Sequence, residues 1–512
     1  MTFTFKLARR LAMCRLALVA LVVSSCQDRD NPAADFTSPT PVAADSTAPQ
    51  LLIATGLMPA MSTQLGGLLQ DQVRDVATDA QGNFYVTGGT QSLNFITTSG
   101  AYDRTENGNY DVFVTKLSPT GQVLWSTLLG GPKYDRAYAI EIDPQGFIVV
   151  AGRSGGGLPA TAGSFDPTFA GSPNTPPYGP QDGFVCKLTP DGASVVFCSY
   201  LGTADERIVR DVAIDNLGNL YLPYRQDLPG LDPTWAGNGY AKTWPGNPEN
   251  IIVKVSPDGK TILAATYFGG NGKEAQNPSI RWMNGRVYLA GQTTSSNLPT
   301  PGGFDHTLSG ATDDFIACFD DQLTTLIYAT YVGGSAEEDV ETHNLAVDPQ
   351  DNAYIASSSS SADLPGVSGG FQTTRRGPKD AFIVKVSPTG ALVNATYFGG
   401  SSTDDFQGIA TDGVQVVVSG NSISSDVPLT DGRLGPGGMQ DALVVRFSAD
   451  LRTLLFSQQS GGSRDDFGRS IVLTSSGHIL AGGMAGSLNW FMSNQLQSGF
   501  GGGTMDGVLT LY

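Results

Sequence analysis

Two short markers recur seven times between residue 62 and the end of the sequence, and this repetition constrains the fold more than any other feature. One marker is a glycine pair, or glycine followed by threonine, that closes an apolar run; it stands at Gly66, Gly130, Gly202, Gly269, Gly333, Gly399 and Gly461. The other opens a strand-like run, and it stands at Asp111, Asp182, Asn250, Asp313, Asp380, Asp441 and Asp506. Successive copies of the second marker are 61 to 71 residues apart. A period of this length indicates a chain built from repeated supersecondary units.

One unit, residues 334–400, shows what is repeated. It contains four apolar runs, separated by two tight turns and one polar loop, at 344–347, 353–356, 381–386 and 392–398. The short connections predict four antiparallel strands. The third run is apolar on both faces, as expected for a small sheet that lies between two copies of itself. Radial stacking of such sheets is a β-propeller.

The two ends of the repeated region complement each other. Residues 62–65 resemble the fourth strand of a later unit, whereas the last run, which opens at Asp506, corresponds to a third strand. The N-terminal strand is therefore expected to complete the last sheet, which leaves no unpaired edge. The expected fold is all-β: a single seven-bladed β-propeller of four-stranded antiparallel blades over residues 61–512, closed by this strand. An open solenoid is the alternative, but it does not explain the complementary ends.

Four further motifs recur within the units. They are Asp-x-x-Gly-Asn-x-Tyr at 79–85 and 215–221, Leu-Pro at 158–159, 298–299 and 364–365, Ser-Pro-x-Gly at 118–121 and 256–259, and Thr-Tyr-Phe-Gly-Gly at 266–270 and 396–400. Together they resemble SBBP repeats, which build seven-bladed β-propellers in secreted bacterial proteins. The resemblance spans residues 62–512 and implies the fold. It implies no single catalytic activity.

The N-terminus has the pattern of a secretory signal. A cationic segment precedes an apolar run over residues 16–23, which is far shorter than the ~20 residues of a membrane-spanning helix. The run ends in Val-Ser-Ser-Cys, which resembles a bacterial lipoprotein box with Cys26 as the lipidated residue; ordinary signal cleavage is the alternative. We therefore expect a signal peptide over 1–25, a lipidated Cys26, and a flexible tether over 26–60. This predicts a lipid anchor in the outer membrane, and the acidic segment 27–30 resembles signals for surface exposure.

The charge balance restricts the partners. Asp and Glu number 48 against 30 Lys and Arg, so the net charge is −18. No basic stretch is present, which argues against nucleic acid as a partner. Only three histidines occur. This leaves little room for histidine metal sites or catalytic triads.

Acidic residues follow the glycine pairs at a constant distance. Six of them lie four residues beyond the second glycine: Asp71, Asp135, Glu274, Glu338, Asp404 and Asp466. Because the first strand of a blade is innermost, these carboxylates could ring one mouth of the axial channel and hold a cation, for which Ca²⁺ is the natural candidate. In the alternative interpretation each carboxylate caps backbone N–H groups of its own blade, and nearby arginines such as Arg74 and Arg136 neutralise some of the charge.

The long loops between second and third strands form another candidate surface, expected on the same face as the acidic ring. Phe165, Phe304 and Phe371 occupy equivalent places and are expected to anchor these loops. Trp235, Tyr240 and Trp244 in the third loop are predicted to contact a ligand, because the sequence pattern does not repeat them in the other units. Aromatic planes beside amides suit a glycan, a peptide or a protein surface.

Several other residues have structural interpretations. Cys186 and Cys198 flank the turn around Gly192, so paired strands would place them opposite one another for a disulfide. Cys318 is then a lone thiol. The acid that opens each third strand is interpreted as a cap, and His343 as a histidine satisfied within its loop near Glu341.

These observations predict a lipid-anchored envelope protein whose propeller is a binding or scaffolding module, with no cofactor assigned beyond the candidate Ca²⁺. One alternative is a propeller enzyme, a hydrolase or lyase acting on polysaccharide through carboxylates at the channel mouth. It would need one blade with an acid pair and an Arg or Tyr absent from the others, and no such blade stands out. The other alternative is a purely structural surface protein.

Overall fold

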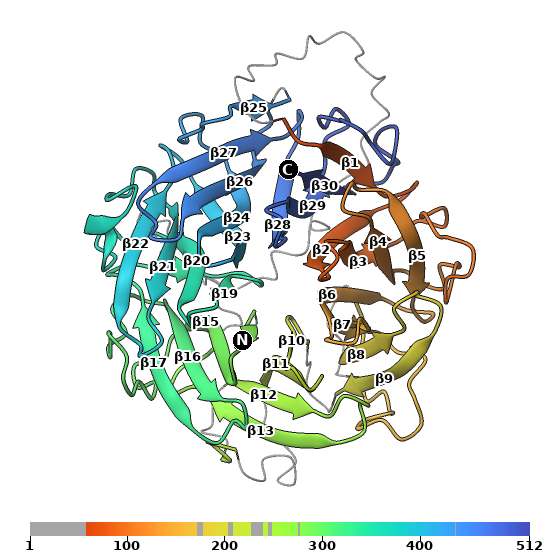
Figure 1. Cartoon of the computed structure of the whole chain (residues 1–512), viewed down its shortest axis with the longest axis horizontal. Helices are drawn as coiled ribbons and strands as arrows, with labels where there is room; N and C mark the ends of the chain where they lie inside the picture. The colour runs from red at the N-terminus through yellow and green to blue at the C-terminus, as the bar shows by residue number, and fades with distance from the viewer. Residues whose placement is uncertain are drawn as a thin grey trace, which may run out of the picture. The chain divides into compact units, whose positions relative to one another are not determined.

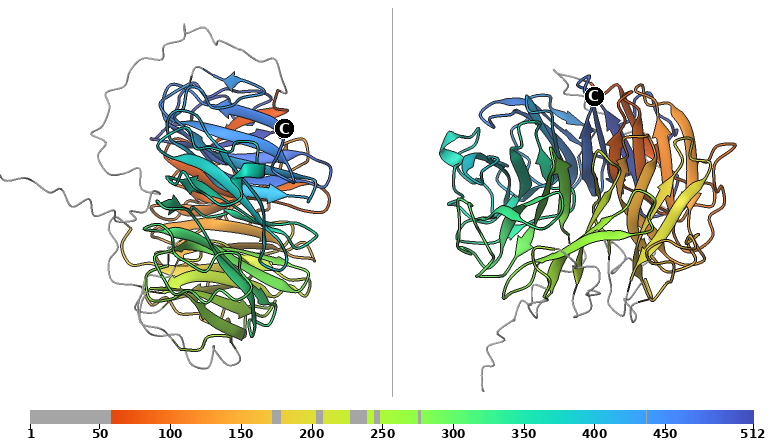
Figure 2. Two further views of the ribbon diagram at one scale, coloured as in Figure 1. Left: turned by 90° about the vertical axis from the view of Figure 1, so that its left-hand side faces the viewer. Right: turned by 60° about the horizontal axis from the view of Figure 1, so that its bottom comes forward.

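The chain forms seven β-sheets arranged around one axis, as the computed structural model shows (Figure 1). The structure describes residues 58–171, 178–202, 208–226, 239–243, 248–274, 277–435 and 437–512. Each sheet is one blade; in blades 1 to 5 the strands follow the chain order from the axis outwards, whereas blade 6 ends on β25 (Arg433–Leu434) and blade 7 ends on β1 (Met61–Leu65). The side views in Figure 2 show the strands running between the two faces of the ring. The predicted all-β, seven-bladed fold is confirmed.

The first four blades each contain four antiparallel strands. Blade 1 consists of β2 (Asp71–Thr78), β3 (Phe84–Thr90), β4 (Asp111–Leu117) and β5 (Val123–Leu129). Blade 2 consists of β6 (Asp135–Ile142), β7 (Ile148–Ser154), β8 (Asp182–Leu188) and β9 (Val195–Leu201). Blade 3 consists of β10 (Ala213–Ile214), β11 (Leu220–Gln226), β12 (Glu249–Val255) and β13 (Ile262–Phe268). Blade 4 consists of β14 (Ser279–Met283), β15 (Arg286–Thr293), β16 (Asp313–Asp320) and β17 (Leu326–Val332).

The remaining blades show small departures from this pattern. In blade 5 the inner strand is split, giving β18 (Glu338–Asp339), β19 (Leu345–Val347), β20 (Ala353–Ser359), β21 (Asp380–Val386) and β22 (Leu392–Phe398). Blade 6 consists of β23 (Asp404–Thr411), β24 (Gln415–Ser422), β26 (Asp441–Ser448), β27 (Leu454–Ser460) and the added β25 (Arg433–Leu434). Blade 7 consists of β28 (Asp466–Leu473), β29 (Ile479–Ala485), β30 (Asp506–Leu511) and β1 (Met61–Leu65). A short 3₁₀ helix spans Val367–Gly369, and no helix among the described residues could cross a membrane.

The N-terminal strand closes the ring as predicted. β1 is the outermost strand of blade 7 and pairs with β30 in antiparallel register, with Thr63 opposite Leu509 (Figure 1). Loop residues hold it from outside: Ser62 exchanges two backbone hydrogen bonds with Ser493, at 2.7 and 2.9 Å, and its hydroxyl accepts the Trp490 indole N–H at 3.0 Å. The first and last strands of the propeller therefore share one sheet.

The hydrophobic core lies between neighbouring blades rather than at the axis. Between blades 2 and 3, for example, Val149 and Val185 pack with Leu222 and Val253, and all four are fully buried. Comparable clusters occupy the other junctions. This explains why the strands are apolar on both faces, since each sheet has a neighbour on either side.

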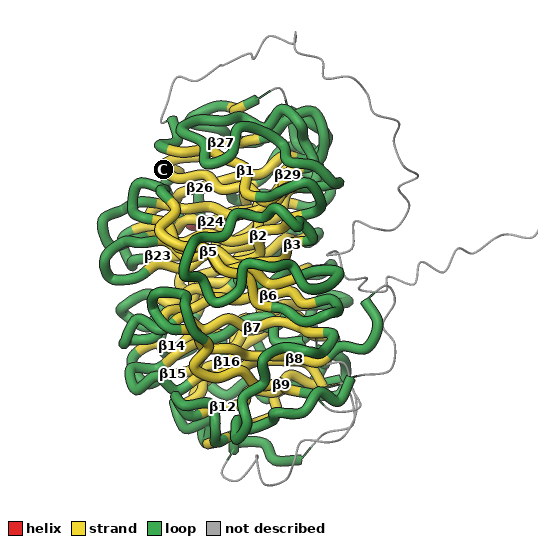
Figure 3. The backbone as a smooth tube through the Cα atoms, turned by 90° about the vertical axis from the view of Figure 1, so that its right-hand side faces the viewer, coloured by secondary structure: helices red, strands yellow, loops and turns green. Residues whose placement is uncertain are grey.

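The long second-to-third-strand loops begin and end at the end of the sheet that carries the first-strand acids, as expected; in blade 1, Thr90 at the end of β3 pairs with both Asp71 and Asp111. From there the described part of each loop runs along the outer strand of its own blade. In Figure 3 these loop segments lie on the outside of the strands. The backbone N–H of Tyr200 in β9 donates to Asp166 O at 2.9 Å, and that of Tyr397 in β22 donates to Gln372 O at 3.0 Å. The physical reason is that an outer strand presents unpaired N–H and C=O groups, which the loop satisfies. The loops cover the edges of the blades.

Candidate functional site

The six carboxylates predicted to form a metal ring are all buried, and each stands at or before the innermost strand of a different blade. Asp71 shows the pattern: its Oδ2 accepts the N–H of Gly67 at 2.6 Å and the hydroxyl of Ser92 at 2.8 Å. The N–H of the second glycine binds the corresponding carboxylate in four more blades, at 2.7 Å for Asp135, 3.2 Å for Glu338, 2.8 Å for Asp404 and 2.6 Å for Asp466.

These contacts are those of local caps. N–H and hydroxyl donors aimed at a carboxylate suit an anion and compete with a cation. Within the described parts of the chain, no three or more His, Cys, Asp or Glu residues come together as a metal-ligand group. The six carboxylates therefore do not converge on one calcium site, because the ring holds them in six separate blades.

A second buried carboxylate faces the first at six of the blade junctions, which sequence reasoning missed. It is the acid that opens the third strand of the preceding blade, and the pairs are Asp506 with Asp71, Asp111 with Asp135, Glu249 with Glu274, Asp313 with Glu338, Asp380 with Asp404, and Asp441 with Asp466. The two acidic series are far apart within each unit. Only the packing of one blade on the next brings them together.

The pairs explain the glycine marker. A methyl group on Gly66 would lie 2.7 Å from Asp71 Oδ2 and 2.9 Å from Asp506 Oδ1. At Gly399 the corresponding distances are 2.8 Å to Asp404 Oδ2 and 2.9 Å to Asp380 Oδ1. Both carboxylates crowd the first glycine at Gly66, Gly269, Gly333 and Gly399, and the third-strand acid crowds Gly130 and Gly461, so a side chain at any of these positions would collide.

The third-strand acid of blade 3 is Glu249, not Asn250 as the sequence suggested. β12 begins at Glu249, which pairs with Gln226 just as Asp182 pairs with Ser154 in blade 2. The sequence pattern misled because Asn250 directly precedes the apolar run, the place that Asp holds elsewhere. In the other six blades the predicted capping role of the third-strand acid is confirmed; Asp313, for example, accepts the N–H groups of Ser309 and Gly310 at 2.8 and 2.9 Å.

Burial and the facing charge both disfavour ionisation of these acids. Burial, with a contribution from the partner, raises the pKa of Asp111, Asp466 and Asp506 to about 7. Burial also raises the pKa of Asp71 and Asp135 to about 6, although their hydrogen bonds oppose it. At these junctions burial therefore moves the pKa of the five acids towards neutral pH.

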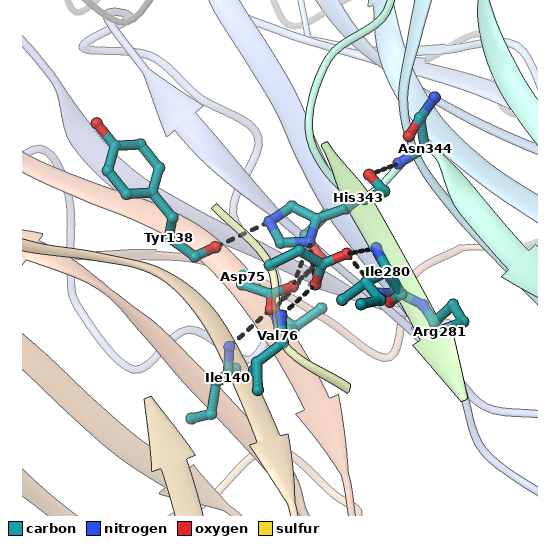
Figure 4. A network of polar contacts seen from close by, with 12 residues as sticks. Asp75, Val76, Tyr138, Ile140, Ile280, Arg281, His343 and Asn344 are labelled. Carbon is teal, nitrogen blue, oxygen red and sulfur yellow. Dashed lines mark hydrogen bonds and ion pairs between the residues drawn. The ribbon is translucent and has the colours of Figure 1, made fainter. Parts of the chain in front are cut away.

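A polar network at the axis joins six of the seven blades (Figure 4). His343 lies between β18 and β19 of blade 5; its Nε2 donates to Tyr138 O of blade 2 at 2.8 Å. Its Nδ1 faces Asp75 Oδ1 of blade 1 and Asp211 Oδ1 beside blade 3, each at 3.7 Å. Asp75 also accepts from Ile140 N at 2.8 Å and from Ser470 Oγ of blade 7 at 2.6 Å. His343 is thus a buried loop histidine with a hydrogen-bond partner, as predicted, and the acids that face its Nδ1 come from other blades.

Arg281 of blade 4 completes this network. Its Nη1 donates to Asp211 Oδ2 at 2.7 Å, and Ile280 N donates to the same oxygen at 2.9 Å. Burial alone would raise the pKa of Asp211, but Arg281 and His343 outweigh it and lower that pKa. Burial disfavours protonated His343, yet Asp75 and Asp211 raise its pKa above the usual range. The sequence carried one signal of this site: Asp75 and Asp211 hold the same place in their units, where Ala139 and Ser470 stand in others.

Four arginine side chains surround Tyr138 in blades 1 to 3. Their guanidinium carbons lie 5.8, 4.6, 5.7 and 4.2 Å from the centre of its ring, for Arg74, Arg136, Arg153 and Arg210 respectively. The Gln72 Oε1 accepts from Arg74 Nη2 at 2.7 Å and from Arg136 Nη1 at 3.0 Å. This cluster does not follow the repeat of the blades. The sequence analysis predicted only that Arg74 and Arg136 lie near the acids.

Of the three aromatic residues predicted to bind a ligand, Trp235 and Trp244 lie outside the described residues. Tyr240 is 41% exposed, and its ring packs edge-on against Phe319 at 6.0 Å. Its backbone N–H donates to Leu323 O in the next blade at 2.7 Å, as that of Phe165 does to Gly259 O at 2.9 Å. Tyr240 is therefore the blade 3 copy of a repeated loop aromatic, which corrects the prediction that it has no counterpart.

A hollow of about 380 Å³ opens beside Tyr240. Its walls come from the blade 3 loop, the end of β13 and the blade 4 loop, namely Tyr240, Ala241, Thr243, Tyr267, Phe268, Gly269 and Pro299. None of these residues carries a charged side chain. The hollow can accept an uncharged, partly apolar group.

The cysteine predictions are met. Cys186 and Cys198 face each other across β8 and β9 and form a disulfide, with their Cα atoms 4.0 Å apart. Cys318 is a buried free thiol.

Comparison with known proteins gives the repeat its name. Residues 62–96 and 327–365 match the SBBP family, described as a β-propeller repeat. The chain is a seven-bladed β-propeller that contains SBBP repeats. Each matched range in this SBBP-repeat propeller runs from an outer strand through a glycine pair into the next blade, so it includes the first-strand acid and its junction.

The SBBP-repeat propeller also resembles part of a curated protein. Over 303 residues it is 26% identical to the regulatory protein FlaEY of Caulobacter vibrioides. The aligned region covers 55% of this chain and 28% of that protein. The chain thus spans less than a third of the length of that relative.

Solved structures of other proteins also align with this propeller. A protein of unknown function from Dyadobacter fermentans has 11% identity and a TM-score of 0.40, over 89% of this chain and 98% of that one. A quinohemoprotein alcohol dehydrogenase from Comamonas testosteroni has 11% identity and a TM-score of 0.40, over 89% of this chain and 76% of that one. Identities this low say nothing about activity or ligand.

Proposed function

We propose that this protein is a binding module of the bacterial cell envelope, held to the outer membrane by lipid on Cys26 and by the tether over 26–60, and that the hollow beside Tyr240 receives a neutral carbohydrate. The signal pattern of residues 1–25 supports the location. The Cys186–Cys198 disulfide supports it independently, because disulfides persist in oxidising compartments outside the cytoplasm.

The observation that carries the ligand proposal is the hollow itself. Its volume of about 380 Å³ falls within the range of small-ligand sites, roughly 300–1,000 Å³. Tyr240 forms one wall with its ring held by Phe319, so the exposed face is oriented before any ligand arrives. A rigid aromatic wall binds with little loss of conformational entropy.

The chemistry of the walls selects the ligand class. Aromatic and proline surfaces suit the apolar face of a sugar ring, and Thr243 supplies a hydroxyl for hydrogen bonding. A charged peptide would lose solvation here without gaining an ion pair from the described residues that line the hollow. A neutral glycan therefore fits the walls better than a charged peptide does.

A glycan array and a peptide array, both probed with the purified full chain, test this proposal. Tyr240→Ala should weaken binding of the captured neutral glycan by at least about tenfold, the loss expected for ~1.4 kcal/mol of aromatic contact. Tyr102→Ala is the matched control, because Tyr102 is 38% exposed and its backbone N–H donates to Gly192 O in the same way. Capture of charged peptides alone, or equal binding by Tyr240→Ala and the wild type, would overturn the proposal.

A further inference from the structure

The junction between blades 3 and 4 differs from the other junctions in its acid pair. Both members are glutamates, Glu249 at the start of β12 and Glu274 before β14, and their exposed fractions are 0% and 1%. A methyl group on Gly269 would lie 2.5 Å from the Glu249 Cδ and 2.6 Å from the Glu274 Oε2. Two buried carboxyl groups therefore meet over one glycine.

The hydrogen bonds of the two glutamates are unequal. Glu274 Oε1 accepts the hydroxyls of Thr293 and Ser295 at 3.0 and 2.7 Å. Neither oxygen of Glu249 accepts a hydrogen bond from the residues that the structure describes, whereas the backbone N–H of Gly270 also interacts with Glu274 and favours its charged form. At the next junction, by contrast, both oxygens of Asp313 accept backbone N–H groups.

An ionised Glu249 would be costly in this place. A buried carboxylate without donors loses several kcal/mol of solvation, and two facing carboxylates cannot both remain charged. Burial first, and then the charge of Glu274, raises the pKa of Glu249. Of the other titratable groups around the pair, Tyr331 donates its hydroxyl to Ser295 O at 2.7 Å, and the Lys273 side chain is exposed to solvent. Neither brings a positive charge to Glu249.

We propose that Glu249 is a carboxylic acid at neutral pH and that its O–H donates to Glu274 Oε2, which forms a proton-dependent latch between blades 3 and 4. The proton resolves both problems at once, since it removes one charge and supplies the missing donor. Such an acid–carboxylate hydrogen bond is short and strong. The latch is lost in alkaline solution, where the two ionised carboxylates repel across the junction. Gly269 also borders the hollow beside Tyr240, so the latch lies next to that surface.

The decisive variant is Glu249→Gln, measured in the full chain by thermal melting between pH 6 and pH 10. The glutamine amide can donate where the acid did and cannot ionise. At pH 7 the variant should melt within about 2 °C of the wild type. The melting temperature of the wild type should fall as the pH rises above neutral, and the melting temperature of the variant should fall less.

Asp313→Asn is the matched control. Its amide cannot accept both N–H groups that the carboxylate accepts, so it should melt below the wild type at every pH. The infrared spectrum of the folded protein gives a second readout: the wild type should show a protonated carboxylic acid band that Glu249→Gln lacks. The proposal is overturned if this band is absent from the difference spectrum, or if Glu249→Gln destabilises as much as Asp313→Asn. It is equally overturned if Ca²⁺ raises the wild-type melting temperature and Glu249→Gln abolishes that rise, because the pair would then hold a cation.

Discussion

Replacing His343 by asparagine removes the cation between two buried acids at the axis. His343 has a backbone φ of 64°, a left-handed conformation that asparagine tolerates better than most residues. The substitution therefore changes the charge with little added backbone strain. What it leaves behind is Asp75 and Asp211, both buried, with Arg281 on one side of the network only.

The size of the effect follows from the distances. Each His343–carboxylate contact is 3.7 Å, and one such pair is worth roughly 4–5 kcal/mol at an effective dielectric near 20. Asp75, whose pKa burial already raises, would respond by taking up a proton, which limits the loss. Breaking a buried pair by removing one partner typically costs about 3–5 kcal/mol. For a propeller of this size we expect a fall in melting temperature of roughly 3–5 °C.

The pKa shifts of His343 and Asp211 determine how the loss of stability depends on pH. A histidine with a raised pKa stabilises the fold fully below its unfolded value of 6.5 and loses this contribution as the pH rises through its folded pKa. Asp211 has a lowered pKa, so its contribution is present above the unfolded value of 3.8 and disappears as the pH falls through its folded pKa. The difference between wild type and His343→Asn should therefore be largest between about pH 5 and 6.5 and shrink in alkaline solution.

Circular dichroism melting between pH 4 and pH 9 measures this difference. His306→Asn is the control, since His306 is exposed and its Nδ1 contacts the Thr300 hydroxyl only 3.0 Å away on the same loop. A His343→Asn protein that melts with the wild type at pH 6, or whose deficit grows with rising pH, would refute the reasoning.

Three other predictions follow from the junctions and the ends of the chain. Deletion of residues 59–67 should lower the melting temperature of the whole propeller in one cooperative step, because it removes β1 from blade 7; unchanged melting would contradict ring closure. Gly399→Ala should destabilise the protein by about 1–3 kcal/mol in urea titrations, since the new methyl would lie 2.8 Å from Asp404 Oδ2, whereas Gly499→Ala, with no atom within 4 Å, should stay within about 0.5 kcal/mol. Cys26→Ser should move the protein from the membrane fraction to the soluble fraction on cell fractionation, and retention in the membrane would argue against the lipid anchor.

The sequence alone determined the architecture of the repeat. Alternating apolar runs and turn residues encode strands locally, so the four-stranded unit could be predicted without any tertiary information. Ring closure was also predictable, because residues 62–65 match a fourth strand and the run at Asp506 matches a third. The Cys186–Cys198 disulfide followed from the turn around Gly192, since strand register is itself a local property.

Only the tertiary structure decided which residues meet between blades. Asp71 and Asp506 are at opposite ends of the chain, and Asp75, Asp211 and His343 come from three different units, yet each set meets at one point. Such contacts depend on how far each blade is rotated about the axis, which no single unit encodes. The edge-covering loops and the assignment of Glu249 depended on the same information. Periodicity describes what each unit repeats, whereas the polar sites arise where different units face one another.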